Sequence, residues 1–319
     1  MDLSVSVIGT VFIDCKGFAC NEYFPDGRNL GDIEFVHGGV GRNVAENLSK
    51  MDLPVKLIAS VDKNSMGQEV LETLNNKGVD IDDVMLAEND GMGMWLAIIN
   101  ERGDLAGSIS KMPDLTLLEK LIVEKGGKLI EESSHVILEL DLNSKLTRNV
   151  MDLCNKKDKP VYGIPGNLDI IMKNLDILPK LECFICNDFE AGTIIGKDLN
   201  SLSLEEIKKQ LMNHFFTENL SSRYSIVTLG SLGSIYYNRD SKEVGYHKAI
   251  KTKVVDTSGA GDAYFSGTVA GLIKGLPLKD AVMSGTKVAS WTISSNKSIC
   301  SNLRAKEKEE NCKLFSLHS

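Results

Sequence analysis

A glycine-rich segment near the C-terminus carries the clearest chemical signal in the sequence. It reads VVDTSGAGDAYFSG over residues 254–267, where two valines and two residue types that favour helix N-caps precede three small residues. The small residues are Gly259, Ala260 and Gly261. Because the first N–H groups of a helix have no intrahelical partner and lie at the positive end of its dipole, such a turn is typical of an anion hole. It can stabilise a transferring phosphoryl group or another developing oxyanion.

Asp262 follows this turn directly, in the first turn of the expected helix. A first-turn acid can simply interact with the helix dipole, which stabilises a helix by about 0.3–1 kcal/mol. It can also take the proton from an attacking hydroxyl, and we favour this role because a carboxylate beside a phosphate needs a task. The dipole is expected to lower the pKa of Asp262. A weak base suffices for phosphoryl transfer, in which the proton moves late.

A second pair of glycines lies near the N-terminus, in HGGVGRNVAENLSKM over residues 37–51. Gly38 and Gly39 precede a stretch with apolar residues at helical spacing, a pattern that simple loops also show. Asn43 can donate and accept hydrogen bonds, and Asp14, which we expect at the end of the first strand, can accept two from hydroxyl groups. Because doubly wound sheets bind ligands at the carboxyl ends of their strands, these residues suit a polyhydroxylated ligand.

Four other chemistries lack support in the sequence. There is no GxxxxGK[ST] motif, and the first strand leads into GTVFID where a nicotinamide-binding chain would have GxGxxG. No Ser–His pairing at a strand–turn–helix supports an acyl-transfer enzyme. Cys183 and Cys186 have CxxC spacing, but residues i and i+3 of a strand point to opposite faces and no second pair completes a zinc site.

Apolar runs and amphipathic stretches alternate along most of the chain, which predicts strands and helices in alternation. The expected strands are 3–9, 55–61, 135–140, 160–164, 183–186 and 225–230. The expected helices are 41–52, 65–77, 114–132, 144–156 and 202–217, followed by a hairpin over 234–252 and helices over 259–274 and 279–295. Such alternation implies an α/β fold with a mostly parallel, doubly wound sheet that is flanked by helices.

Two stretches do not fit this alternation. Residues 14–36 are polar and contain glycine, and residues 91–112 alternate around an ERGD turn that is typical of a β-hairpin. We expect both in a small sheet that can act as a lid, although a solvated edge sheet or a dimer contact explains the pattern almost as well. We interpret residues 1–319 as a single domain with this lid, and the charged tail over 304–319 as peripheral.

Composition limits the partners of the chain. Lys and Arg number 36 against 44 Asp and Glu, and the formal net charge of −8 argues against binding to duplex nucleic acid. A small anionic ligand stays compatible, because backbone N–H groups and a bound metal ion can neutralise it. We expect no membrane association, since no apolar run approaches about 18 residues. The 7 irregularly spaced cysteines suit a reduced, cytoplasmic chain.

The two glycine segments together resemble the signatures of the PfkB family, the ribokinase-like carbohydrate kinases. The second signature is similar to DTSGAGDAYFSG (256–267), and the first is similar to GGVGRNVAENLSKM (38–51). Two motifs between them agree with the family as well. They are NxxE over residues 187–190 and TxGxxG over residues 228–233. The resemblance extends from residue 3 to about residue 295.

The resemblance implies a ribokinase-like fold with a small β lid, in which ATP and Mg²⁺ serve to phosphorylate a sugar-type hydroxyl. Asp262 matches the family's catalytic base, and Gly259, Ala260 and Gly261 match its anion hole. The positions that match substrate-binding residues are Asp14, Gly38, Gly39 and Asn43. The positions that match the nucleotide-phosphate contacts are Thr228, Gly230 and Gly233, and those that organise Mg²⁺ and its waters are Asn187 and Glu190. Asp256, and Ser258 through its carbonyl, match positions that bind K⁺ or another monovalent cation in many members. A homodimer paired through the lid is implied too.

Within the family, GGVGRN followed by AENL is most like the pseudouridine-kinase branch, and ELDLN (139–143) is similar to that branch's acidic element. The lid residues Met94 and Trp95 could pack against a base or form the lid's own core. Many members carry an Asp after the strand over 160–164, where this chain has Gly163. A nucleoside and a simple pentose, hexose or sugar phosphate therefore both stay candidate substrates. A ligand-binding regulatory protein with a decayed kinase site is the alternative from another class.

Overall fold

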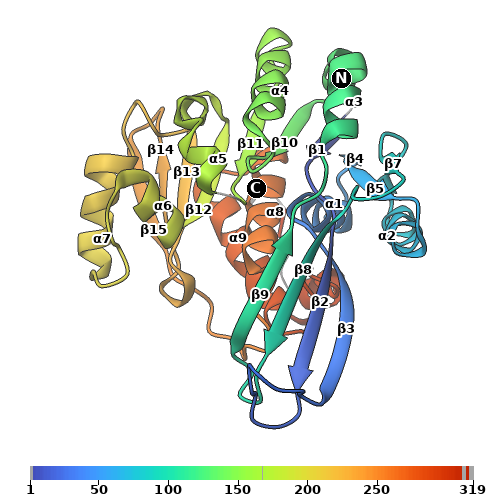
Figure 1. The fold of residues 1–319 in the computed structure, drawn as a ribbon. Helices are drawn as coiled ribbons and strands as arrows, with labels where there is room; N and C mark the ends of the chain where they lie inside the picture. The colour runs from blue at the N-terminus through green and yellow to red at the C-terminus, as the bar shows by residue number, and fades with distance from the viewer. Residues whose placement is uncertain (1–2, 167, 311–313, 316–319) are drawn as a thin grey trace.

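The computed structural model describes residues 3–166, 168–310 and 314–315, and its central feature is one large sheet (Figure 1). The strands of this sheet, in spatial order, are β15 (Glu243–His247), β14 (Ser234–Asn238), β13 (Tyr224–Thr228), β12 (Cys183–Asn187), β11 (Val161–Ile164), β10 (His135–Glu139), β1 (Val5–Ile8), β4 (Val55–Ile58) and β6 (Val79–Asp80). Neighbours from β6 to β13 pair in parallel, whereas β14 and β15 are antiparallel. The mostly parallel sheet is therefore confirmed.

Helices cover both faces of this sheet, as the alternation of strands and helices predicts (Figure 1). One face is covered by α1 (Val40–Lys50), α2 (Ser65–Asn76), α8 (Ala260–Ile273) and α9 (Leu278–Thr292). The other face is covered by α3 (Thr116–Glu132), α4 (Ser144–Lys156), α6 (Asp188–Ile195) and α7 (Leu204–Gln210). Cys183 packs in the first core and Cys186 in the second, so the two thiols do point to opposite faces. Burial raises the pKa of both, which makes neither suited to metal or redox chemistry.

The two stretches that break the alternation meet in a separate small sheet below the large one (Figure 1). Its strands, in spatial order, are β3 (Gly31–Gly38), β2 (Phe12–Ala19), β8 (Gly93–Ile99) and β9 (Leu105–Lys111). Asp14 lies opposite Trp95, and Trp95 lies opposite Ser110. Because side chains alternate along a strand, these three share one face of the sheet. We call β3, β2, β8 and β9 the lid sheet.

Several local details differ from the sequence-based expectations. The strand expected over 55–61 is divided into β4 and β5 (Ser60–Asp62), and β5 pairs with β7 (Met85–Ala87). The helix expected over 202–217 is α7 followed by the π-helical η2 (Leu211–Phe215). The wider turn lets the neighbouring side chains of Phe215 and Phe216 both enter the core. Short elements that were not predicted are α5 (Leu168–Met172), η1 (Leu175–Lys180), α6 and η3 (Gly230–Leu232).

The beginning of the charged tail packs against the body of the protein. It forms α10 (Leu303–Glu309), where Leu303 is buried, and Trp291 of α9 donates a hydrogen bond to Glu310 at 2.6 Å. The described part of the tail thus contacts the body of the protein, and Leu314 within it is buried in the core. The remainder, 311–313 and 316–319, lies outside the described residues. Within the described part of the chain, no helix combines the length and apolar character that a membrane crossing requires.

Candidate active site

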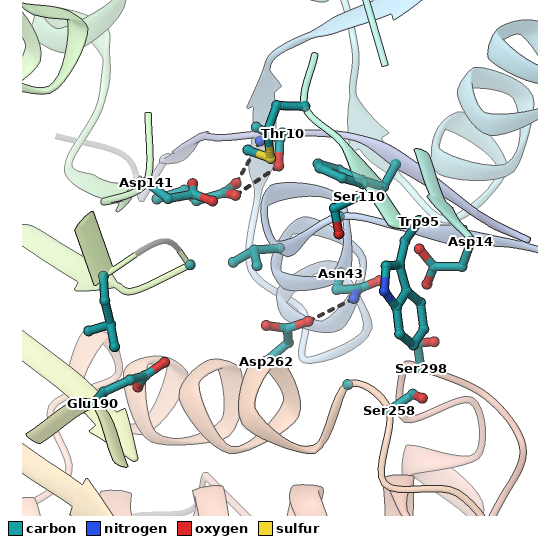
Figure 2. A pocket seen from close by; sticks show the side chains of 18 of the residues that line it. Thr10, Asp14, Asn43, Trp95, Ser110, Asp141, Glu190, Ser258, Asp262 and Ser298 are labelled. Carbon is teal, nitrogen blue, oxygen red and sulfur yellow. Dashed lines mark hydrogen bonds between the residues drawn. The ribbon is translucent and has the colours of Figure 1, made fainter. Parts of the chain in front are cut away.

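A cavity of about 670 Å³ lies between the lid sheet and the carboxyl ends of the large sheet's strands (Figure 2). Thr10, which follows β1, and Asp14 of β2 contribute to its wall. Asn43 of α1 and Asp262 of α8 line it as well, and Glu190 of α6 lies on the far side of Asp262 from the lid residue Trp95 (Figure 2). Side chains that are distant in sequence therefore converge where doubly wound sheets bind their ligands.

The glycine-rich turn begins α8 at the wall of the cavity. Gly259 is the N-cap with a φ of 74°, and a Cβ there would lie 1.9 Å from the carbonyl oxygen of Ser298, so only glycine fits. Ala260 N–H donates to the Thr257 carbonyl at 3.2 Å, which occupies one of the expected donors. The N–H groups of Gly261 and Asp262 have no intrahelical partner at this end of a helix. The turn can thus present backbone donors to an anion.

Asp262 lies at the same wall and accepts a hydrogen bond on Oδ2 from Asn43 Nδ2 at 2.7 Å (Figure 2). Burial raises its pKa to about 7, although the Asn43 hydrogen bond and the positive charge of Arg42 oppose the rise. The expected lowering of this pKa by the helix dipole was wrong, since the loss of water around the carboxyl group outweighs it. Asp262 is therefore a stronger base than its position in the helix suggests, with a pKa close to neutral pH.

Asp14 faces the cavity from within lid strand β2. The sequence had suggested a different position, at the end of the first strand. Its carboxylate is accommodated by Gly38, because a Cβ on that residue would lie 2.5 Å from Asp14 Oδ1. Gly39 is the N-cap of α1, with a φ of 93°, and lines the cavity too. Burial raises the pKa of Asp14, and the charges of Lys16 and Arg42 offset part of the rise. The structure thus brings Asp14, its glycine neighbours and Asn43 together.

Two carboxylates at the end of β10, Glu139 and Asp141, complete this part of the site. Glu139 accepts hydrogen bonds from Thr10 N at 2.6 Å, from Thr10 Oγ1 at 2.7 Å and from Gly41 N at 3.0 Å, and so ties β10 to the loop after β1 and to α1. Asp141 lies against Gly166, and its Oδ1 is buried without a hydrogen-bond partner among the described residues. Burial raises the pKa of both groups. The ELDLN motif was the signal for this pair.

Gly163, where an acid was missing, lies inside the core. A Cβ at this position would lie 2.7 Å from Leu181 Cδ1 and 2.9 Å from Leu140 Cδ1. An acid in this strand would be buried between apolar side chains, away from the cavity wall. Asp141, which follows the neighbouring strand β10, supplies a carboxyl group at the same edge of the sheet. Position 163 of β11 therefore has no room for an acid that could reach the cavity.

Asn187 and Glu190 form a capping box at the start of α6. Asn187 Oδ1 accepts from Glu190 N at 2.8 Å, and Glu190 Oε2 accepts from Asn187 N at 2.7 Å. Glu190 also lines the cavity, and burial raises its pKa. Among the described residues, no group of three or more His, Cys, Asp or Glu side chains could hold a metal ion. One fixed carboxylate without a cage fits Mg²⁺, which keeps several waters and binds substrate phosphates.

The TxGxxG turn lies farther along the same edge of the sheet. Thr228 ends β13 directly opposite Asn187 of β12, and Gly230 and Gly233 shape the turn that follows, with φ values of 54° and 109°. None of these residues belongs to the described lining of the cavity. Thr228 thus lies at the same edge of the sheet as Asn187.

The loop before the anion hole is bonded to the lid. Lys16 Nζ of β2 lies 3.0 Å from Asp256 Oδ2 and 3.1 Å from Ser258 Oγ. Asp256 Oδ1 accepts from Ser258 N at 2.8 Å, so both oxygens of this carboxylate have partners within the protein. The Asp256 carboxylate, expected at a free monovalent cation, is thus already paired with a lysine ammonium. The same ammonium contacts the hydroxyl of Ser258, whereas the carbonyl of Ser258 was expected to hold the ion.

A family model described as pfkB family carbohydrate kinase matches residues 2–304. The match includes both glycine segments and every site residue described above. The chain belongs to the pfkB family. This pfkB-family protein is accordingly a kinase that acts on a carbohydrate or a nucleoside.

Similar proteins include nucleoside kinases and ribokinases. The pfkB-family chain is 35% identical to a guanosine-inosine kinase of Exiguobacterium acetylicum over 291 residues, which are 91% of this chain and 94% of the relative. It is 26% identical to a pseudouridine kinase of Escherichia coli over 91% of this chain and 90% of the relative. The predicted likeness to pseudouridine kinase is present, but the guanosine-inosine kinase is more similar.

The fold comparison agrees with the sequence comparison. A structure of Arabidopsis thaliana ribokinase complexed with ribose and ATP superposes with a TM-score of 0.80 at 18% identity. It covers 99% of this chain and 100% of the ribokinase chain. The ribokinase-like fold that the motifs implied is thereby confirmed for this pfkB-family kinase.

Proposed function

We propose that this kinase transfers the γ-phosphoryl group of ATP to a ribose hydroxyl of a ribonucleoside, with purine nucleosides such as guanosine and inosine as the preferred acceptors. The observation that carries this proposal is the aromatic wall beside the sugar-binding side chains. Trp95 lies next to Asp14 on the lid, and Asp262 is seen between Trp95 and Glu190 (Figure 2). A nucleoside can therefore place its base at Trp95 and its ribose at Asp14 and Asn43.

The apolar surface near Trp95 is larger than a free pentose requires. Phe12 lines the cavity from the same face of β2 as Asp14, and its ring lies flat against Gly93, where a Cβ would come within 2.3 Å. Met112 adds a third apolar side chain. Aromatic faces stack well on nucleobases, while sugar hydroxyl groups prefer polar partners. The similarity to the guanosine-inosine kinase supports the same substrate class.

In the proposed reaction the oxygen of the ribose hydroxyl bonds to the γ-phosphorus of ATP, and the bond between this phosphorus and ADP breaks. Asp262 accepts the proton of the hydroxyl. Asn43 orients the Asp262 carboxylate through the 2.7 Å hydrogen bond. Gly259, Ala260 and Gly261 hold the turn whose N–H groups face the developing negative charge. Asp141 lines the same cavity, and its carboxyl group can accept a hydrogen bond from the acceptor.

The nucleotide side of the site is proposed from the remaining residues. Thr228, Gly230 and Gly233 would contact the ATP phosphates at the end of β13. Asn187 would keep Glu190 in place through the capping box, and Glu190 would bind the waters of Mg²⁺. When bound, Mg²⁺ supplies positive charge to the β- and γ-phosphates.

We also propose that the chain is one kinase domain whose lid sheet pairs with a second copy. One face of the lid faces the cavity, and the other exposes large apolar side chains. These are Ile33, Phe35, Met94, Leu96 and Ile109. An apolar patch of this kind is typical of an interface with another chain. Light scattering should give a dimer for the intact chain and a monomer for Ile109→Asp; a monomeric wild type would contradict the pairing.

We expect this kinase in the cytoplasm, where ATP and reduced thiols are available.

A substrate screen tests the proposed function. ADP release should be measured with guanosine, inosine, pseudouridine, uridine, ribose, fructose and fructose phosphates as acceptors. We expect the highest kcat/KM for a purine nucleoside. A preference for ribose or fructose would contradict the assignment. Binding of a nucleoside in calorimetry, with no ADP formed, would instead favour the regulatory alternative.

A lid variant tests the role of the aromatic wall. Trp95→Ala removes the proposed stacking partner of the base, which should raise the KM for the nucleoside by about 10- to 100-fold. Its kcat should change less, because Trp95 does not touch the reacting hydroxyl in this arrangement. An unchanged KM would remove Trp95 from the base site. Ser110→Ala, at the neighbouring lid position, is the matched control for a change in the same wall.

A further inference from the structure

A buried lysine of the lid reaches the loop that precedes the anion hole. Lys16 lies on the same face of β2 as Phe12 and Asp14, and only 6% of it is exposed. Its ammonium group bonds to Asp256 at 3.0 Å and to Ser258 at 3.1 Å, across 240 residues of sequence for the first pair. This is a lid-to-core contact between a charged pair, with the lysine side chain 8% and the aspartate side chain 30% exposed.

The loop that Lys16 contacts determines where the anion hole lies. Asp256 also accepts the N–H of Ser258 at 2.8 Å, and Val255 N–H donates to the Ile293 carbonyl at 2.8 Å. Gly259 follows directly and is pressed against Ser298. A shift of Asp256 would therefore move the start of α8 and its N–H groups.

The charge of Lys16 matters as much as its position. An unpaired carboxylate at Asp256 would repel a phosphoryl group that approaches the start of α8. Burial opposes ionisation of Asp256, but the hydrogen bonds from Ser258 and Lys16 outweigh it, so the pKa of Asp256 lies below its usual value. The carboxylate is thus ionised and locally neutralised.

We propose that the Lys16 ammonium is a built-in cation of the anion hole, which stands where a free monovalent cation would otherwise bind Asp256 and which couples the lid strand to the start of α8. The proposal rests on the kinase activity and makes Lys16 a positioning residue. It follows that the enzyme works without K⁺, and that removing the ammonium creates a requirement for a monovalent cation.

The first test needs no substrate. Thermal unfolding of the intact chain should be compared in KCl and in tetramethylammonium chloride at equal ionic strength. We expect the same Tm in both salts for the wild type and for Lys63→Ala, whose lysine pairs with Glu88 at the surface. Lys16→Ala should be more stable in KCl, since an ion that binds only the folded state stabilises it. A higher Tm of the wild type in KCl, or no salt difference in Lys16→Ala, would overturn the proposal.

The second test uses the reaction with whichever acceptor is turned over. In tetramethylammonium, Lys16→Ala should lose about 10- to 100-fold in kcat, the cost of one charge-assisted contact. K⁺, NH₄⁺ or methylammonium should restore it by about fivefold or more, while Lys16→Met, whose side chain fills the space, should respond less. A purely structural salt bridge would not show this rescue.

The outcomes separate the two proposals. Full activity of Lys16→Ala in tetramethylammonium, or a K⁺ requirement in the wild type, would overturn the role of Lys16. A lack of activity of the wild type toward every nucleoside would instead reject the proposed acceptor, and the thermal measurements would then decide the role of Lys16 alone. The comparison of the wild-type Tm in the two salts involves no variant. It therefore tests the proposal even if Lys16→Ala does not fold.

Discussion

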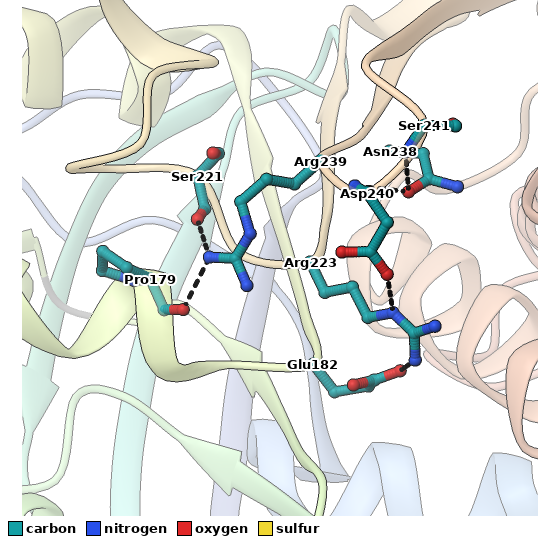
Figure 3. Close-up of polar contacts among 8 residues, drawn as sticks. All are labelled: Pro179, Glu182, Ser221, Arg223, Asn238, Arg239, Asp240 and Ser241. Atoms are coloured by element: carbon teal, nitrogen blue, oxygen red, sulfur yellow. Dashed lines mark hydrogen bonds and ion pairs between the residues drawn. The ribbon is translucent and has the colours of Figure 1, made fainter.

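Charged side chains are paired differently at the two ends of the strands of the large sheet. At the amino-terminal edge of β12 and β13, Arg223 pairs with Glu182 at 2.8 Å and with Asp240 at 2.7 Å (Figure 3). Arg239 donates from one nitrogen to the carbonyls of Pro179 and Ser221 at 2.8 and 3.0 Å (Figure 3). Each of these guanidinium groups has protein partners, and the Arg223 side chain is 44% exposed.

At the carboxyl edge, acids outnumber their partners. Asp14, Asp262, Glu139 and Asp141 all have pKa values that burial raises, and Asp262 is close to neutrality. Acidic side chains therefore stabilise the fold weakly at the amino-terminal edge, where they are paired, and lower its stability at the carboxyl edge, where they are buried. A fold that retains uncompensated carboxylates in a cavity does so for binding or catalysis, since stability alone would select against them.

Asp262→Asn should have the largest effect on this contrast. Loss of the base should reduce kcat by about 10²- to 10⁴-fold, the usual contribution of a general base. Binding of ATP, measured by calorimetry, should change little, because Asp262 faces the acceptor hydroxyl. Activity within tenfold of the wild type would remove Asp262 from the reaction. Asp176→Asn, a surface acid paired with Arg148, is the control.

Asp14→Asn should have the next largest effect, and on a different kinetic constant. The neutral amide accepts hydroxyl hydrogen bonds more weakly than the charged carboxylate. The KM for the acceptor should therefore rise by about 10- to 100-fold. The Asp262 base stays in place, and kcat should fall less than KM rises. A fall in kcat with KM unchanged would assign Asp14 to the chemical step instead.

The pH dependence of the reaction should follow Asp262. Because the base must be ionised and its pKa is about 7, kcat should fall by about tenfold for each pH unit below that value. The profile of kcat between pH 5 and 9 measures this. A flat profile of kcat down to pH 5 would show that the pKa of the Asp262 carboxyl group is not raised.

Stability should depend on pH in the opposite sense to activity. The folded chain binds a proton at Asp262 that the unfolded chain, with its pKa of 3.8, has lost. Its contribution to stability therefore falls as pH rises from about 4 to about 7. Asp262→Asn should remove this cost, so its Tm should exceed that of the wild type at pH 8 and match it near pH 4. An equal difference at both pH values would contradict the assignment.

Arg223→Ala should have the smallest effect and marks the other side of the contrast. Exposed ion pairs contribute about 0–1 kcal/mol, and water can replace both partners of this guanidinium. Denaturant unfolding should show a loss of that size, with kcat and KM unchanged. A loss of several kcal/mol, or a change in kcat, would end the distinction between the two edges.

The sequence by itself determined the local parts of this protein. The turn from Gly259 into α8 and the glycines before α1 were recognised because helix starts and backbone approach depend on a few neighbouring residues. The alternation of apolar runs likewise predicted the parallel sheet and the hairpin of the lid, since periodicity reports which face of an element is buried. These features need no knowledge of distant contacts.

Only the tertiary structure decided what surrounds those parts. The pKa of Asp262 depends on how much water the lid and α1 remove, and no local pattern reports that. Lys16 meets Asp256 across 240 residues. Gly163, which looked like a missing acid, proved to be a core position between Leu140 and Leu181. Desolvation and long-range contacts are properties of the packed chain, and the chemistry of this site depends on both.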